Sequence, residues 1–280
     1  MHSATPIDPG RHIDWSKTSA DYAAHRPGPP QRLYDMLAAM GVGLPGQHLL
    51  DLGTGTGLLA REFARRGAQV CATDIASGQI EAARVEAQRE GLVIDFRTAP
   101  AEACPYADAS FDVVTAGQCW MYFDPDRTCA EVKRVLKPGG LLVTTHFSWL
   151  PAIDEIARAS EVLVLQFNPA WRGAHWSGHV PAVPAWAPGR ATVRGMFWFD
   201  AQVPFTAERW RGRIRACRGV GATLLAPEVE AFDTAHAALL ARIAPAEFSV
   251  WHRIDAHVLQ LDGPAITRRL LPHSAQTERR

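Results

Sequence analysis

The segment 51–57 combines an acidic residue with a glycine-rich turn, a pairing that suits cofactor binding. It reads DLGTGTG, in which Asp51 precedes Gly53, Gly55 and Gly57. Glycine tolerates positive φ angles and lets a ligand approach the backbone closely. Apolar residues at helical spacing follow Gly57, so the free N–H groups of a helix start would favour a negative or hydrogen-bond-accepting ligand group. A purely structural turn without a ligand is the alternative interpretation.

Further polar residues stand at or directly after the ends of predicted strands. Asp74 closes the apolar stretch 68–74, and His146 ends the stretch 141–146. Gln118 follows another predicted strand. In open α/β sheets ligands bind at the carboxyl ends of the strands, so we expect these side chains at the same edge as the glycine turn. The plainer alternatives are a helix-capping Asp74 and a structural His146.

The elements that must position these residues alternate along the first half of the chain. The expected strands are 48–50, 68–74, 92–98, 111–116 and 141–146, and the expected helices are 31–40, 58–66, 77–90 and 124–136. The second half predicts helices at 151–166, 206–218 and 227–243, strands at 192–204 and 248–261, and a long irregular connection at 168–190. This alternation predicts an α/β fold with a doubly wound, mostly parallel sheet of seven strands.

The chain is expected to form one domain over residues 1–280. Within it we predict an N-terminal helical cap at 13–45, a core at 46–150, and a second cap with the last strands at 151–272. The first ten residues and those from Pro272 onward are expected to be disordered, as chain ends often are.

Composition narrows the classes of function. The chain has 29 Lys and Arg against 29 Asp and Glu, so no overall basic character indicates a nucleic-acid partner. Its five cysteines include no C-x-x-C pair, which favours reduced thiols in a cytoplasmic protein and no metal site. The sequence MHSATPIDPG lacks the apolar segment of a secretory signal, and no apolar run reaches ~18 residues, so we expect no membrane insertion.

Several motifs in order resemble the class I S-adenosylmethionine (SAM)-dependent methyltransferases. The matching residues are Asp51, Gly53, Gly55 and Gly57, then Asp74, Ala101-Glu102, the sequence DASFD at 108–112, and the sequence LKPGG at 136–140. They cover about 51–146 and are similar to the branch that includes ubiquinone-biosynthesis-type small-molecule methyltransferases. The resemblance implies a Rossmann-like sheet whose last strand is antiparallel, SAM as cofactor and S-adenosylhomocysteine as product.

The resemblance also implies a set of cofactor residues. These are Tyr22, Arg26, Asp51, Gly53, Gly55, Gly57, Asp74, Ile75, Ala101, Glu102 and Gln118. Asp74 would accept the ribose hydroxyls, Ile75 would lie on the adenine face, and Arg26 would hold the methionine carboxylate. A solvated Glu102, a purely structural Asp51 and a surface Arg26 remain open.

The acceptor side is less defined. His146 is the candidate general base for a hydroxyl or ammonium acceptor. Candidate substrate residues are Trp120, Trp149, Trp171, His175, Trp176, Arg211 and Arg215. The arginines predict either an anion clamp or a solvated basic helix face. The irregular segment 168–190 predicts a lid over the acceptor pocket.

Three functions follow as hypotheses. The first is a methyltransferase acting in line on a small-molecule acceptor, with O-, N- or C-methylation unresolved. The second is a nicotinamide-dependent oxidoreductase of Rossmann type, which the G-x-G-x-G spacing and the LKPGG turn disfavour. The third is a catalytically silent SAM-binding subunit. Neither the acceptor nor the oligomeric state follows from the sequence.

Overall fold

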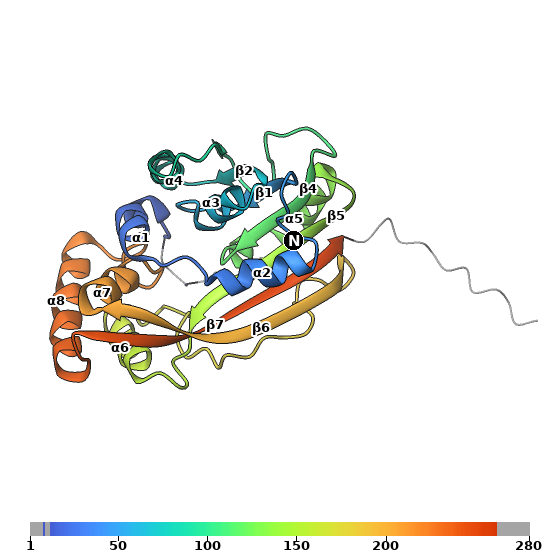
Figure 1. Ribbon diagram of the computed structural model, residues 1–280. Helices are drawn as coiled ribbons and strands as arrows, with labels where there is room; N and C mark the ends of the chain where they lie inside the picture. Colours follow the sequence, from blue (N-terminus) through green and yellow to red (C-terminus); the bar gives the residue numbers. More distant parts are fainter. Residues whose placement is uncertain (1–7, 9–11, 262–280) are drawn as a thin grey trace, which may run out of the picture.

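One mixed sheet organises the molecule. The structure is a computed structural model that describes residue 8 and residues 12–261. Within these residues the strands form a seven-stranded sheet in the order β3-β2-β1-β4-β5-β7-β6 (Figure 1). The strands are β1 (His48–Leu52), β2 (Gln69–Asp74), β3 (Asp95–Thr98), β4 (Phe111–Gly117), β5 (Leu136–Trp149), β6 (Ala191–Thr206) and β7 (Glu247–Leu261). The expected α/β fold class is confirmed.

The direction of each strand follows from its neighbours. β1 to β5 pair in parallel, whereas β7 pairs antiparallel with both β5 and β6. The central strands β1 and β4 are buried along almost their whole length, as expected for parallel strands covered on both faces. The seven-stranded sheet with an antiparallel last strand is therefore as predicted.

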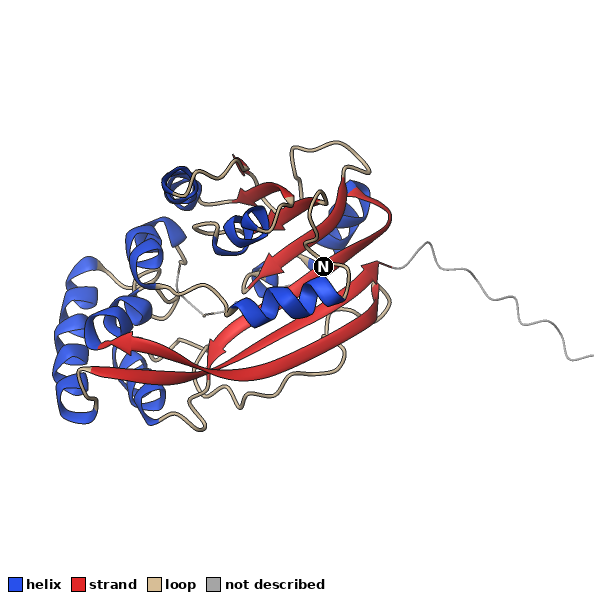
Figure 2. Cartoon of the chain, in the orientation of Figure 1, coloured by secondary structure: helices blue, strands red, loops and turns tan. Residues whose placement is uncertain are grey.

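Helices cover both faces of this sheet and gather at one end of it. They are α1 (Ser19–His25), α2 (Gln31–Ala39), α3 (Leu58–Arg65), α4 (Ser77–Arg89), α5 (Pro125–Val135), α6 (Glu155–Phe167), α7 (Ala207–Arg215) and α8 (Ala226–Ile243), with 3-10 turns η1 (Trp15–Thr18) and η2 (Trp120–Tyr122). Figure 2 shows the arrowheads of the central strands directed toward the end where α1, α7 and α8 lie. Helices from both ends of the chain thus cover the carboxyl edge of the parallel strands.

Local sequence signals explain most element boundaries. Asp124 caps α5 by accepting from the amides of Asp126 and Arg127, and Pro125 occupies its first turn. Asp154 and Thr206 cap α6 and α7 in the same way. Ser77 does not cap α4, because the helix begins at Ser77 itself.

β3 and β5 depart furthest from the strand boundaries predicted from the sequence. β3 is shorter than expected and covers only Asp95–Thr98. β5 is longer and begins at Leu136, because the turn sequence LKPGG remains in the strand as an irregularity between two stretches of pairing with β4. The expected disordered ends lie largely outside the described residues. The division into caps and core stays a prediction.

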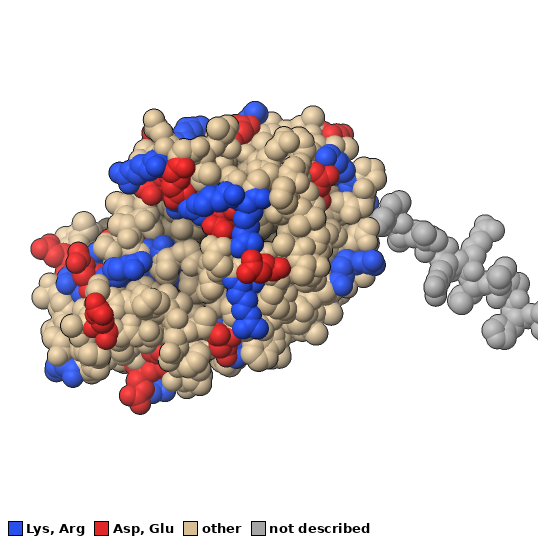
Figure 3. Space-filling view, viewed as in Figure 1, with Lys and Arg blue, Asp and Glu red and all other residues tan. Residues whose placement is uncertain are grey.

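Charge is distributed evenly over the surface in view. Figure 3 shows Lys and Arg side chains interspersed with Asp and Glu on this face. Many are paired: Arg65 and Arg66 of α3 both bind Glu62, and Arg65 also reaches Glu90. Among the described residues no helix is long and apolar enough to cross a membrane.

Candidate active site

A cavity of about 930 Å³ opens at the carboxyl edge of the sheet. Of the residues predicted from the sequence for the cofactor, the cavity is lined by Tyr22, Arg26, Gly53, Gly55, Asp74, Ile75, Ala101, Glu102 and Gln118. Gly57 instead forms the N-cap of α3, and Asp51 lies beneath the turn. The predicted meeting of these side chains at one edge therefore holds in the structure, while their binding roles remain predictions.

The glycine turn has the backbone geometry that only glycine adopts readily. Gly53, Gly55 and Gly57 have φ angles of 60°, 58° and 77°. A Cβ atom added at Gly53 would lie 2.8 Å from Cys119 Sγ, so a side chain would collide there. Glycine at position 53 thus lets Cys119 pack closely against the turn, while Gly53 and Gly55 line the cavity.

Asp51 holds this turn from below. Its two carboxylate oxygens accept hydrogen bonds of 2.6 Å from the hydroxyls of Thr115 and Thr54. Burial raises the pKa of Asp51 to about 6, the two threonine hydroxyls oppose that rise, and nearby Asp74 adds to it. Asp51 also lines a small adjoining cavity with Gly53 and Arg26, so a ligand could reach its vicinity.

Asp74 is held by two backbone amides at the edge of the cavity and does not cap α4, whose N-cap is Ala76. Its Oδ1 accepts from the amide of Ala76, just before α4, and its Oδ2 accepts from the amide of Gly55, both at 2.9 Å. Burial raises the pKa of Asp74, and the backbone donors lower it. Each oxygen retains acceptor capacity toward the cavity. The neighbouring Ile75 is 70% exposed and offers an apolar surface beside it.

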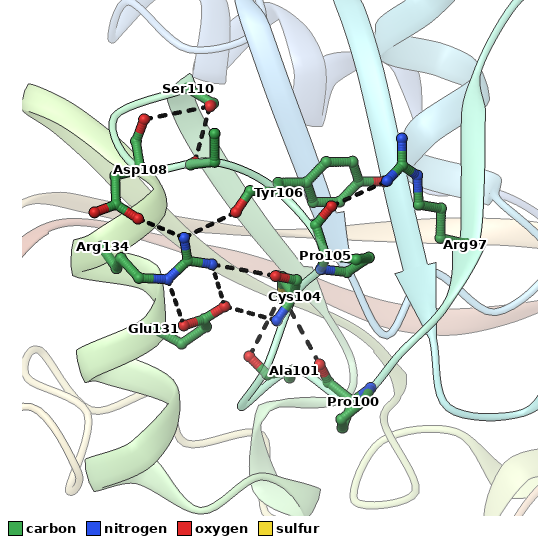
Figure 4. Close-up of polar contacts among 11 residues, drawn as sticks. Arg97, Pro100, Ala101, Cys104, Pro105, Tyr106, Asp108, Ser110, Glu131 and Arg134 are labelled. Atoms are coloured by element: carbon green, nitrogen blue, oxygen red, sulfur yellow. Dashed lines mark hydrogen bonds and ion pairs between the residues drawn. The ribbon is translucent and has the colours of Figure 1, made fainter.

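The loop that carries Ala101 and Glu102 is anchored to α5. Arg134 donates to the carbonyls of Cys104 and Tyr106 and to Asp108, and Glu131 accepts from the Cys104 amide. Figure 4 shows these bonds converging on the Arg134 guanidinium. The anchor fixes a loop that has no regular structure of its own.

Glu102 also connects this loop to the start of α5. Its Oε1 accepts from the amide of Asp124, the N-cap of α5, at 3.0 Å. The residue therefore joins the loop to the helix while lining the cavity. It is not the freely solvated charge that the sequence left open as an alternative.

The N-terminal helix closes the cavity from the side. Arg26 stacks on Tyr22 with 4.6 Å between its guanidinium carbon and the ring centroid. A Cβ atom at Gly55 would lie 3.7 Å from the Tyr22 ring, so Tyr22 covers the glycine turn. Among the described residues Arg26 has no carboxylate within ion-pair distance, which leaves its charge open to a ligand anion.

Gln118 has a strained backbone at the edge of the cavity. Its φ angle is 62°, a left-handed value that is uncommon outside glycine. Its side-chain oxygen accepts from the amide of Phe147, and its side-chain nitrogen donates to Ser148 Oγ. These bonds, together with the bond from the Gln118 amide to the Thr145 carbonyl, tie the residue to β5 at the edge of the cavity.

His146 forms a pair that the sequence did not reveal. Its Nδ1 lies 3.0 Å from Oδ1 of Asp255, which is only 2% exposed. His146 on β5 and Asp255 on β7 are direct partners across the antiparallel pairing. His257 lies on the other side of Asp255, with its Nδ1 at 3.8 Å, and its Nε2 lies 2.8 Å from the Pro181 carbonyl. All three residues line the cavity.

The acceptor-side predictions divide into residues that reach the cavity and residues that do not. Trp120, Trp149, Trp171 and Trp176 line it. His175 does not, and its amide donates to Glu161. The segment 168–190 contributes many lining residues, whereas its predicted mobility is untested by the structure.

The predicted arginine clamp is corrected by the structure. Arg211 and Arg215 do not line the cavity, because both are ion-paired with Asp233, and Arg215 also with Asp21. Two other arginines, Arg213 and Arg218, line the cavity instead. Trp186 of the segment 168–190 also lines the cavity, and so does Glu161, which the sequence reasoning missed.

Comparisons with known proteins agree with this geometry. Residues 50–144 match the family described as methyltransferase domain. A ubiquinone biosynthesis O-methyltransferase of Ruegeria pomeroyi is 37% identical over 134 residues, which cover 47% of this chain and 53% of that protein. The chain thus spans about half the length of the curated relatives it matches.

Solved structures show the same fold. A protein of Anaeromyxobacter dehalogenans, described provisionally as a type II methyltransferase, superposes with a TM-score of 0.53 at 22% identity, covering 84% of this chain and 97% of that one. YjhP of Escherichia coli gives a TM-score of 0.50 at 21% identity, covering 88% and 99%. At these identities the likeness concerns the fold alone.

The strand order places the chain in the Rossmann-like fold, with the glycine turn and Asp74 at the carboxyl edge of its sheet. Residues 50–144 match a methyltransferase domain, so over that segment the chain resembles the class I SAM-dependent methyltransferases. The resemblance inferred from its sequence motifs is therefore confirmed. Its acceptor and its reaction are matters of proposal.

Proposed function

We propose that this chain transfers the methyl group of SAM to a hydroxyl group of a small molecule, with His146 as the general base. The observation that carries the proposal is the pairing of His146 with buried Asp255 inside the cavity that also contains the glycine turn and Asp74. The name of the Ruegeria pomeroyi relative, an O-methyltransferase, supports the choice of a hydroxyl acceptor.

The residues around the turn suit the cofactor. Gly53 and Gly55 line the cavity where the methionine chain would lie, and Asp74 offers two oxygens to ribose hydroxyls. Exposed Ile75 provides an apolar surface for adenine, and unpaired Arg26 provides a cation for the methionine carboxylate. When bound there, SAM supplies an activated methyl group on a sulfonium centre.

Methyl transfer from a sulfonium centre requires little acid–base catalysis from the protein. Its contributions are to align the acceptor oxygen with the methyl group, to exclude water and to remove one proton. Asp255 accepts the Nδ1 proton of His146 in the assigned tautomer, which leaves the Nε2 lone pair available for the hydroxyl proton. The Asp255 carboxylate also stabilises the imidazolium that forms.

The aromatic walls support the positioning part of this mechanism. Trp120 and Trp186 pack with ring centroids 4.3 Å apart, and Trp149 and Trp171 line other parts of the cavity. Flat apolar walls of this kind bury an aromatic acceptor and attract the positive charge of a sulfonium. We therefore propose a small phenol as the methyl acceptor.

Transfer of a labelled methyl group from SAM to a panel of phenols and catechols tests this function. His146→Ala should lower kcat by about 10²-fold or more while the affinity for S-adenosylhomocysteine stays unchanged. Asp255→Asn should also lower kcat and alter the pH dependence of kcat/KM, because the His146 tautomer is no longer fixed. His48→Ala is the matched control, because His48 is exposed at the opposite end of β1. Equal losses of cofactor affinity and kcat in His146→Ala would contradict the assignment.

A further inference from the structure

Arg213 is a buried cation that faces the cavity from α7. It is 4% exposed, and its guanidinium carbon lies 4.7 Å from the Trp149 ring centroid. Both residues line the cavity. Arginine is rarely buried to this extent unless a carboxylate pairs with it. The contacts of Arg213 therefore decide whether its charge is compensated within the protein.

Within the described part of the chain Arg213 has no such partner. No carboxylate oxygen lies within 4.0 Å of it, and its guanidinium makes no hydrogen bond to those residues. The neighbouring Arg211, Arg215 and Arg218 each have a carboxylate within that distance. Burial, with a smaller contribution from the nearby Arg26, lowers the pKa of Arg213 to about 9, so the side chain stays charged at pH 7.

The acidic groups of the cavity are already bound elsewhere. Glu161 accepts from the Trp149 indole nitrogen through one oxygen and from the His175 amide through the other. Asp255 is paired with His146. The Arg213 guanidinium, with five N–H donors, thus lines the cavity against the Trp149 ring and has no carboxylate partner among the described residues. Leaving a buried charge unpaired costs stability, which indicates that a ligand completes the site.

Arg26 places a second positive charge in the same cavity. Arg26 also lacks a carboxylate partner among the described residues, and under the function proposed above it holds the methionine carboxylate of the cofactor. SAM itself carries an ammonium and a sulfonium against that single carboxylate. The bound cofactor therefore leaves the charge of Arg213 uncompensated.

We propose that Arg213 binds an anionic group of the methyl acceptor, so that the acceptor is an aromatic hydroxy acid that carries a carboxylate in addition to its reactive hydroxyl. The planar fork of arginine matches a carboxylate in a bidentate way. Trp149 holds the guanidinium in place through its ring face. This inference rests on the proposed function for the identity of the acceptor, but the anion site can be tested without turnover.

The test compares the binding of 3,4-dihydroxybenzoate and 3,4-dihydroxybenzamide by titration calorimetry, with and without saturating S-adenosylhomocysteine. The two probes differ in charge but hardly in shape. Wild-type protein should bind the carboxylate about 10-fold or more tightly than the amide. Arg213→Met should abolish this preference, Arg213→Lys should retain part of it, and Arg209→Gln on the exposed face of α7 should retain all of it.

Two controls separate the possible failures. Thermal melting should show Arg213→Met folded at or above the wild-type melting temperature, because the change removes a buried unpaired charge. The affinity for S-adenosylhomocysteine should stay unchanged in Arg213→Met; a loss of about 10-fold would instead assign Arg213 to the cofactor and overturn the inference. A wild-type protein without preference for the carboxylate, or a preference that survives in Arg213→Met, would overturn it as well. A carboxylate preference that depends on Arg213 supports the inference even where no methyl transfer is detected, and absent transfer then counts against the proposed function alone.

Discussion

The variant Asp51→Asn tests whether ionisation of the buried carboxyl group beneath the glycine turn lowers the stability of the folded protein. Burial raises the pKa of Asp51 from 3.8 to about 6. A raised pKa means that the folded state holds the proton more tightly than the unfolded state does. The associated stability is fully present below about pH 4 and is lost as the pH rises through about 6.

The size of the effect follows from that pKa difference. About two pKa units at ~1.4 kcal/mol each correspond to about 3 kcal/mol of unfolding free energy. Wild-type protein should lose this amount between about pH 4 and pH 7 through Asp51 alone. The asparagine variant cannot titrate there. The stability of the variant relative to wild type should therefore rise by about 3 kcal/mol over the same range.

Urea denaturation at several pH values between 4 and 8 measures this difference. Other acidic groups with a raised pKa, such as Asp74 and Glu161, titrate in both proteins. Their contributions to the difference in stability therefore largely cancel. The amide introduced in Asp51→Asn keeps one acceptor for the hydroxyls of Thr54 and Thr115, so loss of a hydrogen bond displaces the whole curve without changing its slope. Parallel curves for the two proteins would refute the argument that Asp51 ionises at a cost.

Three further predictions concern the cavity. Asp74→Ala should weaken binding of S-adenosylhomocysteine by about 1–3 kcal/mol, with exposed Asp95→Ala as control, and unchanged affinity in calorimetry would contradict the ribose assignment. Segment 168–190 should exchange its amide hydrogens faster without ligand than with cofactor and acceptor bound; full protection in the free protein would make it part of the core. Asp51 lines the small cavity that adjoins the glycine turn, so its negative charge should favour the ammonium group of a cofactor bound there. Wild-type affinity for S-adenosylhomocysteine should therefore increase from pH 5 to pH 7 as Asp51 ionises, and Asp51→Asn should show a smaller increase in the same titration.

The cofactor edge could be predicted from the sequence because its signals are local. The glycines indicate a turn with positive φ angles, and Asp74 directly follows a run of strand residues. Once strands and helices alternate, parallel strands bring Gly53, Asp74 and Gln118 to the same edge. Neither step needs contacts between distant parts of the chain.

The acceptor side could not be predicted because its contacts are not local. Asp255 becomes the partner of His146 only through the register of β5 and β7, which joins residues 109 positions apart. The helical spacing of Arg211 and Arg215 predicts a shared face, but not which face α7 turns inward. The structure turns Arg213 inward, against the general rule that arginines remain exposed.

Titration calorimetry of the free protein with S-adenosylhomocysteine and, separately, with NADH tests the central claim most directly. The account predicts binding of S-adenosylhomocysteine at one site per chain, and a weakening of that binding by about 1–3 kcal/mol in Asp74→Ala. It predicts no binding of NADH. Binding of NADH at the same site in preference to S-adenosylhomocysteine would contradict the account and favour an oxidoreductase.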